Sequence, residues 1–175
     1  MLTAKELRNI ANKLFTYDED EGLLRWRYDR ISRLKNHLTI KAKAGDVAGW
    51  INDSGYRVVM FLNKKRRASR IIWLIQTGIY PKHEIDHKNG NRSDDRFHNL
   101  REATSSQNHC NVKKYSNNRS GFKGVSWSIQ RCKWRVTIRV RGKQTHLGFF
   151  HDVNQAALAY RNAAPIFHGE FARPQ

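Results

Sequence analysis

The segment from Glu84 to Asn108 constrains the fold of this chain more than any other stretch. Its first four residues, 84–87, have the composition of a short strand, and a polar, turn-rich stretch follows them. Residues 100–103 have the composition of a second strand. The sequence Thr-Ser-Ser-Gln at 104–107 is a capping box, which predicts a helix that begins at Ser105. We therefore expect this segment to fold as strand, loop, strand and helix.

Four polar side chains of the segment have the chemistry of a hydrolytic site. Neighbouring side chains on a strand point to opposite sides, so Asp86 can bind a metal while His87 faces a water molecule from another direction. A neutral imidazole can take a proton from water near pH 7, and Asn99 offers a carbonyl oxygen to its other ring nitrogen. Asn108 lies in the first turn of the predicted helix. Together with Asp86 it supplies the oxygen ligands that a hard divalent cation prefers.

The chain is strongly basic, with a formal net charge of +18 over 175 residues. Such an excess suits a polyanionic partner, although a basic protein can also be soluble for unrelated reasons. Positive charge is densest just before the segment, where we predict phosphate contacts; the alternative is an ordinary solvated face. The residues concerned are Lys64, Lys65, Arg66, Arg67 and Arg70.

The segment resembles an HNH endonuclease, the ββα-metal nuclease fold, as found in many phage-borne and intron-borne homing endonucleases. The resemblance covers about residues 55–112 and is carried by Asp86-His87, Asn99-Leu100-Arg101 and Asn108. It implies that Asp86 and Asn108 bind one divalent cation, Mg²⁺ or Mn²⁺ rather than zinc. It also implies that His87 is the general base and that Asn99 orients it. Arg101 is expected to contact DNA.

A second module is predicted at the C-terminal end. Three strands are expected over 123–128, 133–140 and 144–149, followed by a helix from Asp152 through Ala164. Apolar and basic residues alternate along the middle strand, and no acidic residue occurs from Arg119 to Phe150. One face of the sheet should therefore pack against the helix, while the other is basic and exposed to solvent.

This module resembles the Apetala-two/ethylene-response-factor DNA-binding domain over about residues 119–172, through sequences such as FKGV at 122–125 and LGFF at 147–150. The resemblance implies a sheet that lies in the major groove of DNA. Ser126 and Ser128 stand where the family has arginines, which affects base specificity rather than backbone binding. The predicted DNA-contacting residues are Lys123, Ser126, Ser128, Arg135, Thr137, Arg139, Lys143 and His146.

Upstream of the motif, the sequence predicts small elements. Thr3 and Glu6 form a capping box for an amphipathic N-terminal helix. We further predict a hairpin with its turn at 20–22, a loop over 30–46, a strand over 56–62, a basic turn or returning strand over 63–67, and a helix over 69–77.

Other classes of protein are disfavoured. Cys110 and Cys132 form no CxxC pair, so a four-ligand zinc site is not expected. Zinc bound by His83, His87 and Cys110 is the alternative, but it would consume the proton acceptor. No apolar run is long enough to span a bilayer and no signal peptide is present, so we expect a soluble, intracellular protein without a membrane partner. The resemblance to phage-borne HNH endonucleases implies the cytoplasm of a bacterial or phage-infected cell.

The predicted fold is α+β, with a ββα-metal HNH nuclease domain followed by a three-stranded antiparallel sheet packed on one helix. The expected division is an N-terminal extension over 1–54, which clamps DNA or buttresses the hairpin, then the nuclease over 55–112, a linker over 113–118 and a DNA-binding domain over 119–175. The predicted function is hydrolysis of double-stranded DNA at a preferred site, giving 5′-phosphate and 3′-hydroxyl ends. One active site per chain predicts that a monomer nicks one strand, with pairing of two chains as the alternative. A non-enzymatic DNA-binding regulator with a decayed site and an RNA nuclease are the competing hypotheses.

Overall fold

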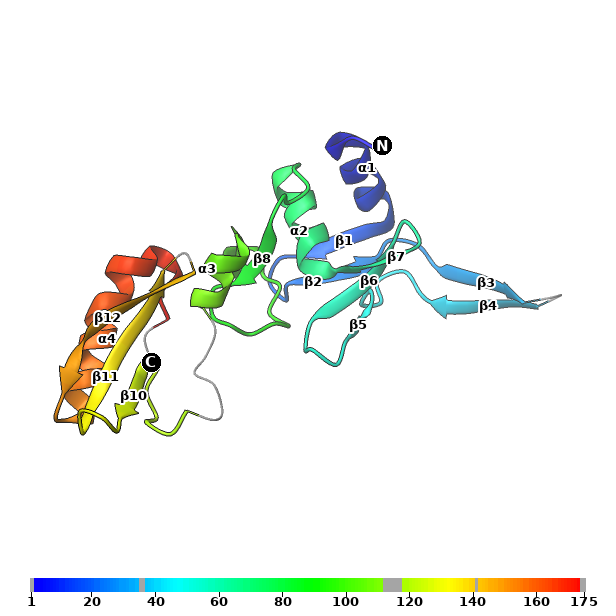
Figure 1. Ribbon diagram of the computed structural model, residues 1–175. Helices are drawn as coiled ribbons and strands as arrows, with labels where there is room; N and C mark the ends of the chain where they lie inside the picture. The colour runs from blue at the N-terminus through cyan, green and yellow to red at the C-terminus, as the bar shows by residue number, and fades with distance from the viewer. Residues whose placement is uncertain (1, 35–36, 112–117, 141, 174–175) are drawn as a thin grey trace. The chain divides into compact units, whose positions relative to one another are not determined.

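The computed structural model describes residues 2–34, 37–111, 118–140 and 142–173. The chain divides into two compact units, Met1–Glu102 and Ala103–Gln175 (Figure 1). The predicted linker over 113–118 lies almost entirely outside the described residues. Across the described part of the chain, no helix has the length and apolar character needed to cross a bilayer.

The first unit consists of short elements arranged in four small sheets. The sheets are β1–β2, β3–β4, β5–β6–β7 and β8–β9. The elements are α1 (Ala4–Leu14), β1 (Phe15–Asp18), β2 (Leu23–Trp26), β3 (Arg30–Leu34), β4 (His37–Ala42), β5 (Trp50–Ile51), β6 (Arg57–Phe61), β7 (Lys64–Arg67), α2 (Ala68–Thr77), β8 (Glu84–His87), the 3₁₀ turn η1 (Phe97–Asn99) and β9 (Leu100–Ala103).

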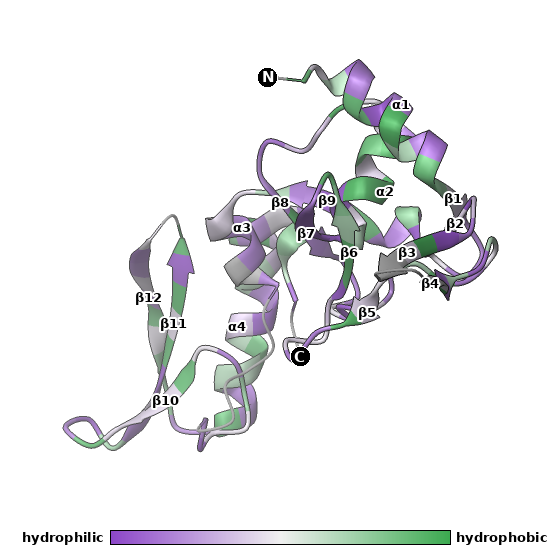
Figure 2. Ribbon diagram, turned by 90° about the vertical axis from the view of Figure 1, so that its right-hand side faces the viewer, coloured by the Kyte–Doolittle hydropathy of each residue, from purple (hydrophilic) through white to green (hydrophobic). Residues whose placement is uncertain are grey.

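Helix α2 lies at the centre of the core of this unit. Ile71, Ile72 and Leu74 are fully buried, and Val59 and Phe61 of β6 belong to the same apolar cluster. Figure 2 shows α2 in the green of hydrophobic residues. Burial of each such side chain stabilises the fold by roughly 1.5–3 kcal/mol. The helix ends at Gly78, which adopts the left-handed conformation that a C-terminal cap requires, as predicted.

Several of the predicted elements are confirmed. Thr3 and Glu6 form the expected capping box at α1. The hairpin β1–β2 is present, and β8 and β9 have the predicted bounds. The segment over 63–67, which the sequence left undecided, contains the returning strand β7. A two-residue turn joins β7 to β6. Its residues, Leu62 and Asn63, both have the positive φ angles typical of such tight hairpin turns.

The prediction of a loop over residues 30–46 is wrong. β3 and β4 form an antiparallel hairpin in which Ile31 pairs with Ile40 and Ser32 with Thr39. Both isoleucines are largely exposed, at 59% and 53%. Since neither side chain is buried in a core, backbone pairing rather than apolar burial defines this hairpin, although Leu38, Ile40 and Ala42 alternate with polar residues along β4.

The second unit is a three-stranded sheet with a helix packed on it. Its elements are α3 (Ser105–Cys110), β10 (Val125–Ser128), β11 (Lys133–Val140), β12 (Lys143–Phe150), α4 (Val153–His168) and the 3₁₀ turn η2 (Gly169–Phe171). The sheet is antiparallel in the order β10–β11–β12. Val136 and Ile138 of β11 are buried in a cluster with Ala156, Tyr160 and Ala164 of α4. The predicted sheet-and-helix arrangement is therefore present.

Helix α4 begins where the sequence predicts and ends later. The side chain of Asp152 accepts a hydrogen bond from the backbone N–H of Gln155 and caps the helix. The helix continues to His168, past the predicted end at Ala164, and contains Pro165.

Candidate active site

His87 ends strand β8 and is held by a buried carboxylate. Its Nε2 atom lies 2.7 Å from Oδ1 of Asp95, and the exposed fractions of the two residues are 3% and 1%. An ionised carboxylate can only accept hydrogen bonds, so the proton resides on Nε2 and Nδ1 becomes the basic nitrogen of the ring. The pair therefore has the arrangement of a general base with its orienting carboxylate.

Burial of the Asp95 carboxylate is unfavourable unless its charge is paired or hydrogen-bonded, because the group loses its contacts with water. Burial raises the pKa of the Asp95 carboxyl, while the hydrogen bond and charge of His87 and the charge of Arg57 oppose this shift. Its second oxygen, Oδ2, is buried without a hydrogen-bond partner. Asp95 was not among the predicted site residues, because an aspartate in a polar loop is usually solvated.

The N-terminal hairpin contacts the backbone of the segment that contains Asp95. The hydroxyl of Tyr17 in β1 accepts a hydrogen bond from the backbone N–H of Phe97 at 2.8 Å and donates one to the carbonyl oxygen of Asp95 at 3.3 Å. In the β1–β2 turn, a Cβ atom on Gly22 would lie only 2.4 Å from the backbone nitrogen of Arg96. Two residues of the segment over 1–54 thus contact the loop that carries Asp95, while the role of the whole segment stays a prediction.

Asp86 precedes His87 and forms a buried ion pair with Arg101 of β9. The guanidinium donates from Nε at 2.9 Å and from Nη2 at 2.8 Å to the same oxygen, Oδ2. Arg101 was predicted to contact DNA, but its side chain is only 11% exposed. Its observed role is to provide a fixed positive charge beside Asp86.

Asn99 organises the loop between β8 and β9 rather than the imidazole. Its Nδ2 donates to Oδ1 of Asn89 and to the backbone carbonyl of Asp94, and its Oδ1 accepts from the backbone N–H of Asn89. The expectation that Asn99 contacts His87 is therefore corrected, because Asp95 bonds the ring. Asn99 acts on the site indirectly, by holding the loop that carries Asp95.

Comparison with known proteins gives a family and a relative. The model of the HNH endonuclease family matches residues 66–110, from β7 to the end of α3. Over 103 residues the chain is 39% identical to "Protein 3.8" of Escherichia phage T7, a match that covers 58% of this chain and 84% of the phage protein. The chain belongs to the family of that phage protein and carries an HNH endonuclease domain. No solved structure matches the chain.

The HNH domain contains all four predicted motif positions. Asp86, His87 and Asn99 lie in the first unit, while Asn108 is half-buried in α3 of the second. The capping box of α3 is present: the backbone N–H of Gln107 donates to Oγ1 of Thr104, and the Gln107 side chain accepts from Thr104. The assignment of Asn108 as a metal ligand stays a prediction.

One basic residue near the HNH motif has a structural role instead of the predicted phosphate contact. The guanidinium of Arg70 donates to the backbone carbonyls of Pro81 and His83 and lies over the ring of Tyr80 at 4.9 Å. It thereby fixes the segment that leads into β8. The side chains of Lys64, Lys65 and Arg66 are exposed, and which of them contacts phosphate stays a prediction.

The loop of the HNH domain contains a second aspartate with a different environment. Hydrogen bonds from Arg96 and Asn89 lower the pKa of the Asp94 carboxyl from 3.8 to about 2, with Arg96 as the main cause. A lowered pKa means that ionised Asp94 stabilises the fold above pH 4 and that this contribution is lost as the pH falls towards 2.

We therefore expect Asp94→Asn to lower the free energy of unfolding at pH 7 and to have no effect near pH 2. A fall in pKa from 3.8 to about 2 corresponds to about 2.4 kcal/mol, but the Arg96 side chain is 44% exposed, so solvent screening reduces the loss to about 1 kcal/mol. Urea unfolding of both proteins at pH 7, 4 and 2 measures this difference. A destabilisation that is the same at every pH would contradict the assignment.

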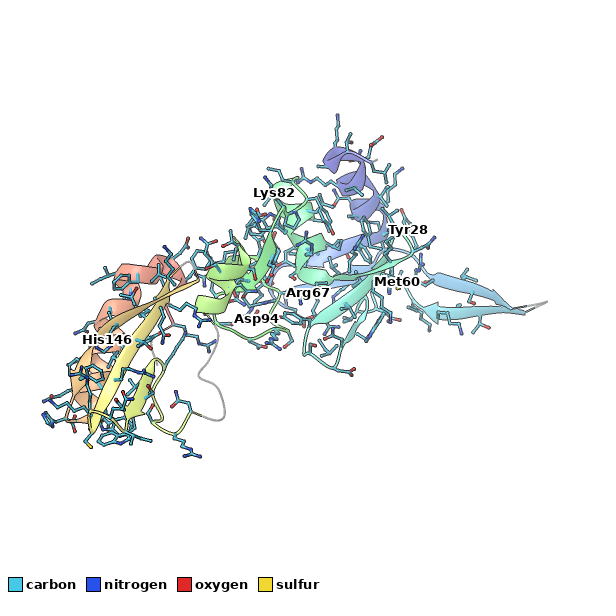
Figure 3. The ribbon with its side chains drawn as sticks, in the orientation of Figure 1. Tyr28, Met60, Arg67, Lys82, Asp94 and His146 are labelled. Carbon is cyan, nitrogen blue, oxygen red and sulfur yellow. The ribbon has the colours of Figure 1, made fainter. Side chains whose placement is uncertain are left out.

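The outward face of the sheet in the second unit carries most of the predicted DNA contacts. Arg135, Thr137 and His146 line a hollow of about 350 Å³ with Gln144 and Phe149. Figure 3 shows His146 on this sheet. The predicted residues Arg135, Arg139, Lys143 and His146 are exposed, and Lys123, Ser126, Ser128 and Thr137 are half-buried.

Proposed function

We propose that this protein is a metal-dependent endonuclease that hydrolyses phosphodiester bonds in double-stranded DNA. The observation that carries the proposal is the buried His87–Asp95 pair next to Asp86 within the HNH domain. A general base held by a carboxylate suits hydrolysis of an ester bond. A formal net charge of +18 suits a polyanionic substrate.

The proposed reaction is an in-line displacement by water. Nδ1 of His87 takes a proton from water, whose oxygen then forms a bond to phosphorus. The bond from phosphorus to the 3′ oxygen breaks, which leaves a 5′-phosphate and, after protonation, a 3′-hydroxyl. Asp95 stabilises the imidazolium that forms during the transfer. General-base catalysis of this kind contributes about 10²–10⁴ to the rate.

Asp86 and Asn108 would hold the divalent cation, Mg²⁺ or Mn²⁺. Their donor chemistry fits such an ion, because both offer oxygen atoms. Among the described residues, no cluster of three His, Cys, Asp or Glu side chains that could hold a metal ion is present. When bound, the ion supplies positive charge that stabilises the developing charge on the phosphate and on the leaving oxygen.

A comparison of DNA and RNA duplexes of the same sequence tests the proposed substrate. With Mg²⁺ present, we expect the labelled DNA to be cut and the RNA to stay intact, because the narrow major groove of RNA excludes a groove-reading sheet. The new DNA ends should be joined by a ligase, which requires 5′-phosphate and 3′-hydroxyl. Cleavage of RNA alone would overturn the substrate assignment, and unligatable ends would overturn the mechanism.

The second unit is proposed to dock on the DNA backbone through its outward sheet face. Each lost phosphate contact reduces the slope of log K against log salt by about 0.9, so Arg135→Ala with Arg139→Ala should reduce it by about 1.8. Arg161→Ala is the matched control, because Arg161 is exposed on α4 and that helix packs on the opposite face of the sheet. Equal slopes for wild type and the double variant would exclude this face from the interface.

A further inference from the structure

We propose that one face of the β5–β6–β7 sheet is a track for the DNA strand that leads away from the cleavage site. The track consists of Tyr56, Arg67 and Arg92 next to His87, followed by Lys65 and Trp50. It rests on the proposed function and assigns phosphate binding to one side of the basic strand β7.

The track begins at an aromatic ring that carries two cations. The guanidinium of Arg67 lies 3.8 Å from the centre of the Tyr56 ring, and that of Arg92 lies 5.1 Å from it. The same ring lies 5.9 Å from the ring of His87. Attraction to the aromatic ring holds both positive groups near the candidate base despite their mutual repulsion.

These two cations differ from the other arginines around the site. Arg96 and Arg101 each pair with an aspartate, so their charges are neutralised within the protein. Within the described ranges, neither Arg67 nor Arg92 forms an ion pair; Arg92 donates one bond, to the backbone carbonyl of Ser54. Two uncompensated charges beside His87 form a site for an anion of the size of a phosphate group.

Strand register separates the basic residues of β7 into two sets. Arg67 pairs with Val58, which also pairs with Trp50 of β5, and Lys65 pairs with Met60. Paired residues share a face of a sheet, and alternate residues do so as well. Figure 3 labels Met60 and Arg67 on this sheet.

The cation contacts agree with this division. Nζ of Lys65 lies 5.7 Å from the centre of the Trp50 ring, which places these two side chains on the same face as Arg67 and Tyr56. Lys64 and Arg66 pair with Phe61 and Val59, the two β6 residues that are buried in the α2 core. Lys64 and Arg66 therefore belong to the opposite face.

The chemistry of the track fits nucleic acid better than an acidic protein. Lys65 and Arg67 are alternate residues of a strand, about 6.6 Å apart, which lets them contact successive phosphates. Trp50 and Met60 are 43% and 40% exposed on the same face. An exposed indole beside cations can stack on a base or contact a sugar, a combination typical of surfaces that bind a nucleic-acid strand.

Two double variants test the track with matched loss of charge. Lys65→Ala with Arg67→Ala removes two charges from the proposed face, and Lys64→Ala with Arg66→Ala removes two from the other face. Binding of a DNA duplex is measured against salt concentration in the full-length His87→Ala background with a chelator present, so that cleavage is suppressed. The first pair should reduce the slope of log K against log salt by about 1.8, and the second pair should leave it unchanged.

Equal slope changes for the two pairs, or none for either, would overturn the track. Thermal unfolding of each variant checks its folding, and Lys65→Gln with Trp50→Ala provides a second test that leaves Arg67 and Tyr56 in place. Loss of binding in this variant supports the track, and wild-type affinity contradicts it. These binding results do not depend on cleavage, so failure of the track is distinguishable from failure of the nuclease proposal.

Discussion

His87→Ala is expected to reduce the single-turnover rate of DNA cleavage about 10²–10⁴-fold while the affinity for DNA stays at its wild-type value. The variant removes the proton acceptor but no surface charge, since the side chain is buried. The rate is measured with a labelled duplex at saturating protein, and the affinity is measured separately in the presence of a chelator.

His83→Ala is the matched control for this experiment. His83 precedes β8 and is exposed, and its contacts are made by backbone atoms, with Arg70 and Glu102. Its substitution should leave the rate unchanged. Undiminished cleavage by His87→Ala would remove His87 from the mechanism.

Asp95→Asn is expected to lower the cleavage rate about 10²–10⁴-fold without a loss of stability. The amide replaces the charge that stabilises the imidazolium and can present an N–H group to Nε2, which selects the wrong tautomer.

The expected stability of Asp95→Asn follows from the raised pKa of the Asp95 carboxyl. Burial raises the pKa of this carboxyl in the folded state, so the folded protein loses stability as the pH rises through the interval between the unfolded and folded values. The amide of the variant does not ionise, so this destabilisation is absent at pH 7. Thermal unfolding should show a midpoint equal to or above that of wild type.

Asp20→Asn, an exposed carboxylate in the β1–β2 turn, should change neither rate nor stability. Wild-type activity of Asp95→Asn would show that the buried carboxylate has no part in the reaction.

Local signals predicted the fold best where an element is half-buried or capped. Strand β11 alternates between buried Val136 and Ile138 and exposed Arg135 and Arg139, so its burial pattern matches its sequence pattern. The capping box at 104–107 located the start of α3 in the same way. In the β3–β4 hairpin burial does not follow the sequence in this way: apolar and polar residues alternate along β4, yet Ile31 and Ile40 are exposed.

The candidate site was predictable only where its residues are neighbours in a recognisable motif. Asp86 and His87 are adjacent, but the bond from Tyr17 to the segment of Asp95 spans 78 residues and leaves no local signal. Charge visible in the sequence also gives no information on burial. Arg70 and Arg101 were predicted to bind DNA, yet their guanidinium groups are engaged within the protein.

Conversion of supercoiled plasmid to nicked circle by the purified protein tests the central claim most directly. We predict nicking with Mg²⁺, none when a chelator is added, and a rate for His87→Ala at least 10²-fold lower than that of wild type. A plasmid that stays supercoiled while the folded protein binds it, or nicking that is unaffected by both the chelator and the substitution, would contradict the assignment of a metal-dependent nuclease based on His87.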